Sequence, residues 1–339
     1  MLSLSPDIII LILVVIMALS FDFINGFHDT ANAIATSVST RALSPRTAIL
    51  IASVLNLIGA LTYTGVAKTI GGSIADPFKL ENGLVIVLAA LTSAILWNLI
   101  TWWFGIPSSS SHALIGGVAG AVVGAAGFDS INMAGFISIV QALIFSPIVA
   151  FVVGFVIIKL VSALVANMPY HRTNRGFRLL QVLSASWQSF SHGANDAQKT
   201  MGIITFALIS GGFMTSETGE ITIPIWVKIS AAIAMALGTS FGGWRIIKTM
   251  GGKIMKIKPI SGFSADLSSA LIITIFTMLK LPVSTTHVIT SSILGVGASQ
   301  KFSAVKWGLA GRILVTWVIT LPATGLLAAA CYVVFDVFL

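Results

Sequence analysis

Long apolar runs are the feature that most constrains how this chain can fold. Several segments reach about 20 residues with few charges, the length that crosses a hydrocarbon core of roughly 30 Å. They are rich in Ile, Leu, Val, Ala and Gly and lack the alternation of a transmembrane barrel strand. With 56% hydrophobic residues, a soluble protein of 339 residues could not bury this much apolar surface. The sequence therefore predicts an all-α polytopic membrane protein.

The net charge of +8 indicates orientation in a membrane and not a nucleic-acid partner. Most basic residues cluster in short segments, which are residues 41–46, 172–178, 245–258 and 301–306. Acidic residues collect in other segments, which are residues 76–81, 129 and 217–220. Such a separation is typical of the excess of Lys and Arg in cytoplasmic loops. Cys331, the single cysteine, excludes an intramolecular disulfide.

Two polar stretches inside the apolar runs are versions of one another. Asp22–Asn32 reads Asp-Phe-Ile-Asn-Gly-Phe-His-Asp-Thr-Ala-Asn. Ser189–Lys199 reads Ser-Phe-Ser-His-Gly-Ala-Asn-Asp-Ala-Gln-Lys, and Asp29 aligns with Asp196. Because a carboxylate buried in a membrane is costly, such residues usually mark a functional site.

A second pair of motifs repeats in the same order. Pro107–His112 (Pro-Ser-Ser-Ser-Ser-His) aligns without a gap with Pro282–His287 (Pro-Val-Ser-Thr-Thr-His). The offset is 175 residues (107 to 282), close to the 167 residues that separate the two aspartates (29 to 196). Two motifs at nearly the same offset indicate an internal duplication.

The charge pattern predicts that the two halves have inverted topology. We take residues 1–168 and 187–339 as the repeats and residues 169–186 as a basic cytoplasmic connector, with a basic loop at residues 171–178. If the Pro-Ser/Thr-His motifs are tips of re-entrant hairpins, at about 84–127 and 263–298, every basic cluster falls on the cytoplasmic side. The expected location is the cell (inner) membrane, with multiple passes, a cytoplasmic central loop and both termini outside.

A glycine beside polar residues predicts a broken signature helix in each repeat. Gly26 follows Asn25 in the first stretch, and Gly193 follows His192 in the second. Glycine tolerates unusual backbone angles, and a break would free carbonyl groups as ligands.

The hydroxyl-rich tips are suited to an oxyanion, because serine and threonine hydroxyls and unpaired N–H groups gather at a helix N-terminus. The alternative is that these residues are ordinary N-caps behind a proline. The predicted anion ligands are Ser108, Ser109, Ser110, Ser111, Ser284, Thr285 and Thr286, together with Asn195.

Carboxylate and amide oxygens beside this pocket suit a hard cation such as sodium. The predicted sodium ligands are Asp22, Asn25, Asp29, Asn32, His192 and Asp196. The alternative for the aspartates is a neutral, hydrogen-bonded role in helix packing. We expect His112 and His287 to hydrogen-bond hairpin backbone. The roles of His28, Lys199, Lys280 and Asp266 are left open.

His192–Lys199 resembles the Gly-Ala-Asn-Asp signature of the inorganic phosphate transporter (PiT) family, and Asn25–Ala33 resembles its bacterial version. The two Pro-Ser/Thr-His tips also match the family. The resemblance implies a bacterial or archaeal member with an inverted-repeat fold and phosphate between the tips. His28 stands where the second copy has Asn195, which leaves open whether the halves bind cations equally.

The leading hypothesis is a secondary active transporter that imports phosphate by symport with sodium, with alternating access around a midplane site. Proton-coupled phosphate or metal–phosphate symport and sulfate transport remain alternatives. Buried carboxylates disfavour an anion channel, and a lone Ser–His proximity is too weak for an enzyme. We expect no cofactor other than coupling sodium ions. The expected partners are phosphate, sodium or protons, and lipid; the sequence leaves a homodimer open.

Overall fold

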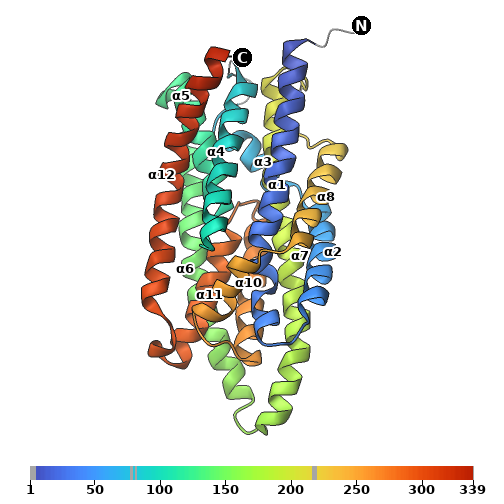
Figure 1. Ribbon diagram of the computed structural model, residues 1–339, viewed down its shortest axis with the longest axis vertical. Coiled ribbons are helices and arrows are strands. Elements are labelled where there is room, and N and C mark those ends of the chain that lie inside the picture. The colour runs from blue at the N-terminus through green and yellow to red at the C-terminus, as the bar shows by residue number, and fades with distance from the viewer. Residues whose placement is uncertain (1–4, 77–78, 81, 216–219, 339) are drawn as a thin grey trace.

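The computed structural model describes residues 5–76, 79–80, 82–215 and 220–338, and every regular element among them is a helix. This confirms the predicted all-α class. The helices form an elongated bundle whose long members run roughly along its long axis (Figure 1). Glu81 and Glu217, which we assigned to acidic loops, lie outside the described residues.

The first half of the chain contains α1 (Pro6–Ser39), α2 (Pro45–Thr62), α3 (Gly65–Ser73), α4 (Gly83–Phe104), α5 (Ser110–Ala126), η1 (Phe128–Ser130) and α6 (Met133–Leu164). The second half contains α7 (Tyr170–Ser210), α8 (Ile225–Phe241), α9 (Trp244–Lys248), the π-helical turn η2 (Thr249–Lys253), α10 (Pro259–Met278), α11 (Thr285–Gln300), η3 (Phe302–Ala304) and α12 (Trp307–Phe338). Proline stands at the first position of α1, α2 and α10, where its missing N–H costs no hydrogen bond.

Within the described residues, six helices are long and apolar enough to cross a membrane: α1, α2, α4, α6, α10 and α12. A seventh span results if α8 and residues 244–253, bent by 58°, count as one. The chain is thus a multi-pass membrane protein. α7 is not in this set because its buried face carries the polar signature Ser189–Lys199.

The predicted break in each signature helix is wrong. Both α1 and α7 run through their glycine without interruption. A Cβ on Gly26 would lie 2.4 Å from the carbonyl oxygen of Met235 in α8, and one on Gly193 would lie 2.2 Å from that of Asn56 in α2. The two glycines therefore permit close helix packing, which needs the missing side chain and not unusual backbone angles.

The predicted loop at residues 171–178 is also wrong, because these residues are helical. α7 begins at Tyr170, so the link after α6 is only residues 165–169. Phe177 is buried and packs on Phe263 of α10 with ring centroids 5.3 Å apart, while the neighbouring arginines are exposed. One apolar anchor and a solvated basic face suffice to continue the helix.

Two helix pairs occupy the segments for which we predicted hairpins. Residues 105–109 join α4 to α5, and residues 279–284 join α10 to α11. The first pair lies in the upper half of Figure 1 and the second in the lower half. Their tips meet, because the Ser111 hydroxyl donates to the Val283 carbonyl at 2.9 Å. The division into repeats and their inverted orientation in the membrane stay predictions.

We expect Gly193→Ala to destabilise the protein by about 1–3 kcal/mol, the usual cost of overpacking a tight contact. The new methyl group would meet the Asn56 backbone, which cannot rotate away as a flexible side chain does. Gly176→Ala on the same helix is the control, since a Cβ there meets nothing within 4 Å. Thermal unfolding of the purified proteins measures the difference, and equal midpoints would contradict the packing role.

Candidate functional site

The two signature helices, α1 and α7, meet the two hairpin tips in the interior of the bundle. All the predicted site residues are buried, namely Asp22, Asn25, Asp29, Asn32, Ser108, Ser109, Ser110, Ser111, His192, Asn195, Asp196, Ser284, Thr285 and Thr286. A polar set of this size inside a membrane protein must find its hydrogen-bond partners within the protein or in a bound ligand.

Each signature aspartate accepts a hydrogen bond from a hairpin hydroxyl. Ser110 Oγ donates to Asp29 Oδ2 at 3.2 Å, and Thr285 Oγ1 donates to Asp196 Oδ2 at 3.0 Å. Ser110 and Thr285 occupy the same position of the aligned tips, as the two aspartates do in the aligned signatures. The duplicated motifs thus make duplicated contacts.

A second pair of contacts crosses between the halves. Asn32 of α1 donates from Nδ2 to Thr286 Oγ1 at 2.9 Å, and Lys199 of α7 donates from Nζ to Ser111 Oγ at 2.5 Å. Asn32 and Lys199 are aligned, and so are Ser111 and Thr286. Each signature helix is therefore tied to the tip of the other half.

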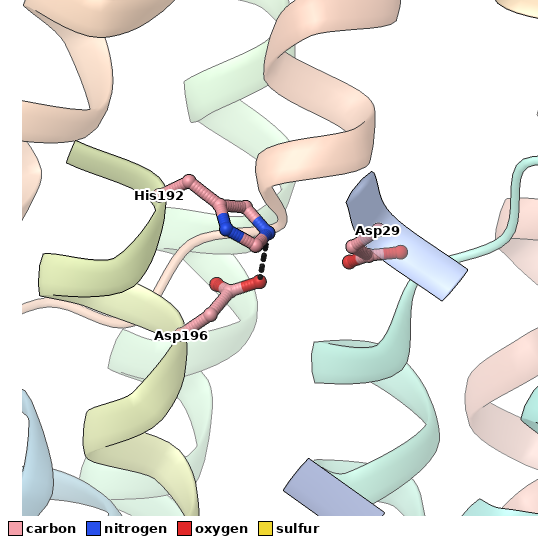
Figure 2. Close-up of side chains that lie close together, drawn as sticks. All are labelled: Asp29, His192 and Asp196. Atoms are coloured by element: carbon pink, nitrogen blue, oxygen red, sulfur yellow. Dashed lines mark ion pairs between the residues drawn. The ribbon is translucent and has the colours of Figure 1, made fainter. Parts of the chain in front are cut away.

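Asp29, His192 and Asp196 form the cluster of potential cation ligands shown in Figure 2. One ligand atom from each lies within 4.8 Å of the others. His192 Nε2 is 3.2 Å from Asp196 Oδ2, and its Nδ1 is 3.0 Å from Asn56 Oδ1. If Nδ1 carries the proton for Asn56, Nε2 meets the carboxylate with a lone pair, so a further proton fits between them.

The first aspartate has its own histidine. His28 Nδ1 lies 2.5 Å from Asp29 Oδ1. Asn195, the aligned residue of the second half, instead binds the second hairpin: its Nδ2 donates to Thr277 Oγ1 at 2.9 Å, and its Oδ1 accepts from Val283 N at 3.3 Å. The difference that the sequence shows at this position is therefore a difference in hydrogen-bond partners between the halves. The predicted anion ligand Asn195 supports the tip.

Asp22 and Asn25 are not joined to the cluster of Figure 2. Both are fully buried on α1, and neither side chain meets the strict hydrogen-bond geometry with a described residue, but Asp22 faces Thr200 and the Asp196–Lys199 pair of α7. Asp22 precedes Asp29 by two helical turns, about 10 Å along the axis. We grouped Asp22 with Asp29 because both lie on one face of the helix. A shared face does not place two residues at the same position along the helix axis.

Two predicted anion ligands are also helix caps. Ser109 Oγ accepts from His112 N at 3.0 Å, and Ser284 Oγ accepts from His287 N at 3.3 Å. This is the alternative that the sequence left open, and it applies to these two serines. Ser108 Oγ contacts Thr101 Oγ1 at 2.7 Å within its own hairpin and also lies 3.5 Å from His28 Nε2 of α1. Ser110, Ser111, Thr285 and Thr286 make the shorter contacts to the signature helices.

The hairpin histidines contact side chains, not the hairpin backbone as we expected. His112 Nδ1 lies 2.8 Å from Ser109 Oγ. The His287 ring stacks on Trp317 of α12 with centroids 3.8 Å apart, and the two histidine rings lie 4.5 Å apart across the tips. The imidazoles thus pack the tips against each other and against α12.

Lys199 is the residue whose importance the sequence left open. It is fully buried and donates to Asp196, to Ser111 and, at 3.0 Å, to the carbonyl of Val283. The sequence signal that could have pointed to this role is a basic residue that lies within an apolar segment and aligns with Asn32. Lys280, in contrast, is exposed at the turn after α10, and Asp266 binds Thr36 Oγ1 at 2.6 Å outside the cluster of Figure 2.

The chain is similar to known transporters over most of its length. The model of the family described as "Phosphate transporter family" matches residues 25–328. A probable low-affinity inorganic phosphate transporter of Bacillus subtilis (strain 168) is 59% identical, covering 97% of this chain and 98% of that protein. One with the same description from Rhizobium meliloti (strain 1021) is 48% identical, covering 96% and 97%.

A solved structure gives the same assignment. "The sodium-dependent phosphate transporter" superposes with a TM-score of 0.89 at 26% sequence identity, covering 97% of this chain and 100% of that one. The family match includes both signature aspartates and both hairpin tips. The chain therefore belongs to the phosphate transporter family.

Proposed function

We propose that the protein imports inorganic phosphate by symport with sodium ions, with alternating access around a site between the tips of the two hairpins. The observation that carries this proposal is the duplicated aspartate–hydroxyl contact at the point where α5 and α11 begin. The printed descriptions of the relatives support phosphate as the substrate, and that of the solved structure supports sodium.

The hairpin tips supply the groups that bind an oxyanion. The N-termini of α5 and α11 present N–H groups and the positive ends of two helix dipoles. Ser110 and Thr285 add hydroxyl groups that now donate to Asp29 and Asp196. A phosphate ion between the tips would accept from these groups.

The shared hydroxyls provide a physical basis for coupling. A sodium ion bound to the Asp29 carboxylate would replace the hydrogen bond from Ser110. The Ser110 hydroxyl could then donate to a phosphate oxygen. Asn32 Oδ1, which has no hydrogen-bond partner among the described residues, is a second oxygen ligand nearby. Inward movement of an anion is uphill by about 2.3 kcal/mol per charge per 100 mV, and the entering cation offsets that cost.

Proton coupling is the second candidate, and one contact favours it. His28 Nδ1 is 2.5 Å from Asp29 Oδ1, so a proton held between them would balance the carboxylate as a sodium ion does. In both cases Asp29 is the residue that receives the coupling ion.

The proposed orientation places the α6–α7 link in the cytoplasm and both termini outside. In Figure 1 this link lies at one end of the bundle, whereas the start of α1 and the end of α12 lie at the other. Arg172, Arg175 and Arg178 are exposed just after the link, which fits the positive-inside rule.

Uptake of labelled phosphate into proteoliposomes tests the function, with sodium, proton and potential gradients imposed separately. We expect an inward sodium gradient to drive accumulation, and unlabelled sulfate not to compete. Accumulation driven by the proton gradient alone would select the second candidate. Uptake that responds to neither cation gradient would contradict symport.

Asp29→Asn should reduce coupled uptake at least tenfold while the protein still inserts. The amide keeps the shape and the contact with Ser110 but cannot balance a cation, and each tenfold loss corresponds to about 1.4 kcal/mol. Asp129→Asn, at an exposed carboxylate, is the control and should be neutral. Unchanged cation dependence in Asp29→Asn would place the coupling ion elsewhere.

Thr285→Val should raise the phosphate concentration at half-maximal uptake by about tenfold, because it removes a hydroxyl from a buried polar site without changing its shape. Thr92→Val on α4 is the control, since that hydroxyl donates to the Leu88 carbonyl of its own helix at 2.8 Å. Uptake kinetics at saturating sodium measure the effect. Equal half-saturation concentrations in the two variants would exclude Thr285 from the phosphate site.

A further inference from the structure

Lys199 and Asn32 occupy equivalent positions of the duplicated signature, yet one is a cation and the other is neutral. Each stands three residues after its aspartate and reaches the equivalent hydroxyl of the opposite hairpin. Because the surrounding contacts correspond, the exchange of amide for ammonium is a difference between two otherwise matched positions.

The Lys199 ammonium group is fully occupied by protein oxygens. Its three N–H donors find three acceptors, which are Asp196 Oδ1, Ser111 Oγ and the carbonyl oxygen of Val283. The side chain has no exposed surface. In this arrangement no donor remains for a phosphate ion.

The three acceptors are the ligand types of a hard cation. A carboxylate, a hydroxyl and a backbone carbonyl are the oxygens that coordinate such ions in proteins. Lys199 Nζ therefore stands where a monovalent cation would be bound if the side chain were absent. The charge of the Asp196 carboxylate is balanced without any ion from solution.

The matched position of the first half has no such fixed charge. Asp29 contacts His28 and Ser110, and neither carries a permanent positive charge. Asn32 uses its Nδ2 for Thr285 and Thr286, while its buried Oδ1 has no partner among the described residues. An unpaired buried amide oxygen beside a carboxylate is suited to receive a cation.

We propose that Lys199 is a tethered cation that permanently fills the second of two equivalent cation positions, so that the protein takes its coupling ion on the Asp29 side alone. This inference rests on the proposed symport in assigning the coupling ion to Asp29. It implies that each phosphate enters with one cation fewer than in a protein with asparagine at both positions.

Sodium binding to the purified protein without phosphate tests the inference independently of transport. Labelled sodium would be titrated onto the wild type, Lys199→Asn and Lys199→Arg. We expect Lys199→Asn to bind about one additional sodium ion per chain, because the vacated oxygens form a site like that at Asn32. Lys199→Arg keeps the fixed charge and should match the wild type. Adding Asp196→Asn to Lys199→Asn should remove the extra ion.

A Lys199→Asn protein that elutes as a single folded species and binds no additional sodium would overturn the inference. If it also lost phosphate binding, Lys199 would instead be a substrate ligand, which equally overturns it. This outcome is distinct from failure of the proposed function. The proposed function fails if phosphate uptake by the wild type does not depend on a cation gradient.

The reverse exchange gives a second test that does not depend on the folding of Lys199→Asn. Asn32→Lys should place a tethered cation beside Asp29, so the variant should bind about one sodium ion fewer than the wild type. In this variant, the factor by which sodium stimulates phosphate uptake should fall at least tenfold. Sodium binding equal to that of the wild type would contradict the equivalence of the two positions.

Discussion

Two of the carboxylates buried among the apolar helices, those of Asp29 and Asp196, are the constraint on which the rest of this structure depends. In a membrane interior an unbalanced carboxylate is costly, so Asp29 and Asp196 must be balanced by protein donors or by ions. The protein brings a histidine to each aspartate, a hairpin hydroxyl to each, and an ammonium group to only one of them. A site whose charge balance is incomplete on one side is suited to exchange an ion with solution.

Close packing makes these contacts possible. Gly26 and Gly193 let the signature helices approach their neighbours at backbone distance, which leaves the polar face of each helix directed at the hairpin tips. The tips in turn contact each other through Ser111 and Val283. The short hydroxyl side chains of Ser110 and Thr285 reach the aspartates because the first turns of α5 and α11 lie directly beside α1 and α7. The contacts of the candidate site therefore depend on the close packing of the bundle.

The sequence predicted the helical class correctly because the long apolar runs are a local pattern. The duplicated motifs pointed to residues that are buried in the interior of the bundle, and the roles of those residues as ligands stay predictions. The roles of Gly26 and Lys199 depend on partners far along the chain, Met235 and Ser111, and a single sequence does not reveal these. The helix break was predicted from the flexibility of glycine, whereas the structure uses its small size. Asp22 was grouped with Asp29 by helical periodicity, which gives the face of a residue but not its depth.

A structure of the protein determined by cryo-electron microscopy with sodium and phosphate would test the central claim most directly. The claim predicts tetrahedral density between the first turns of α5 and α11, within hydrogen-bond distance of Ser110 and Thr285. It also predicts density for a cation at Asp29 and none between Asp196 and the Lys199 ammonium group. Phosphate density elsewhere in the bundle, with the two tips still in contact, would contradict it.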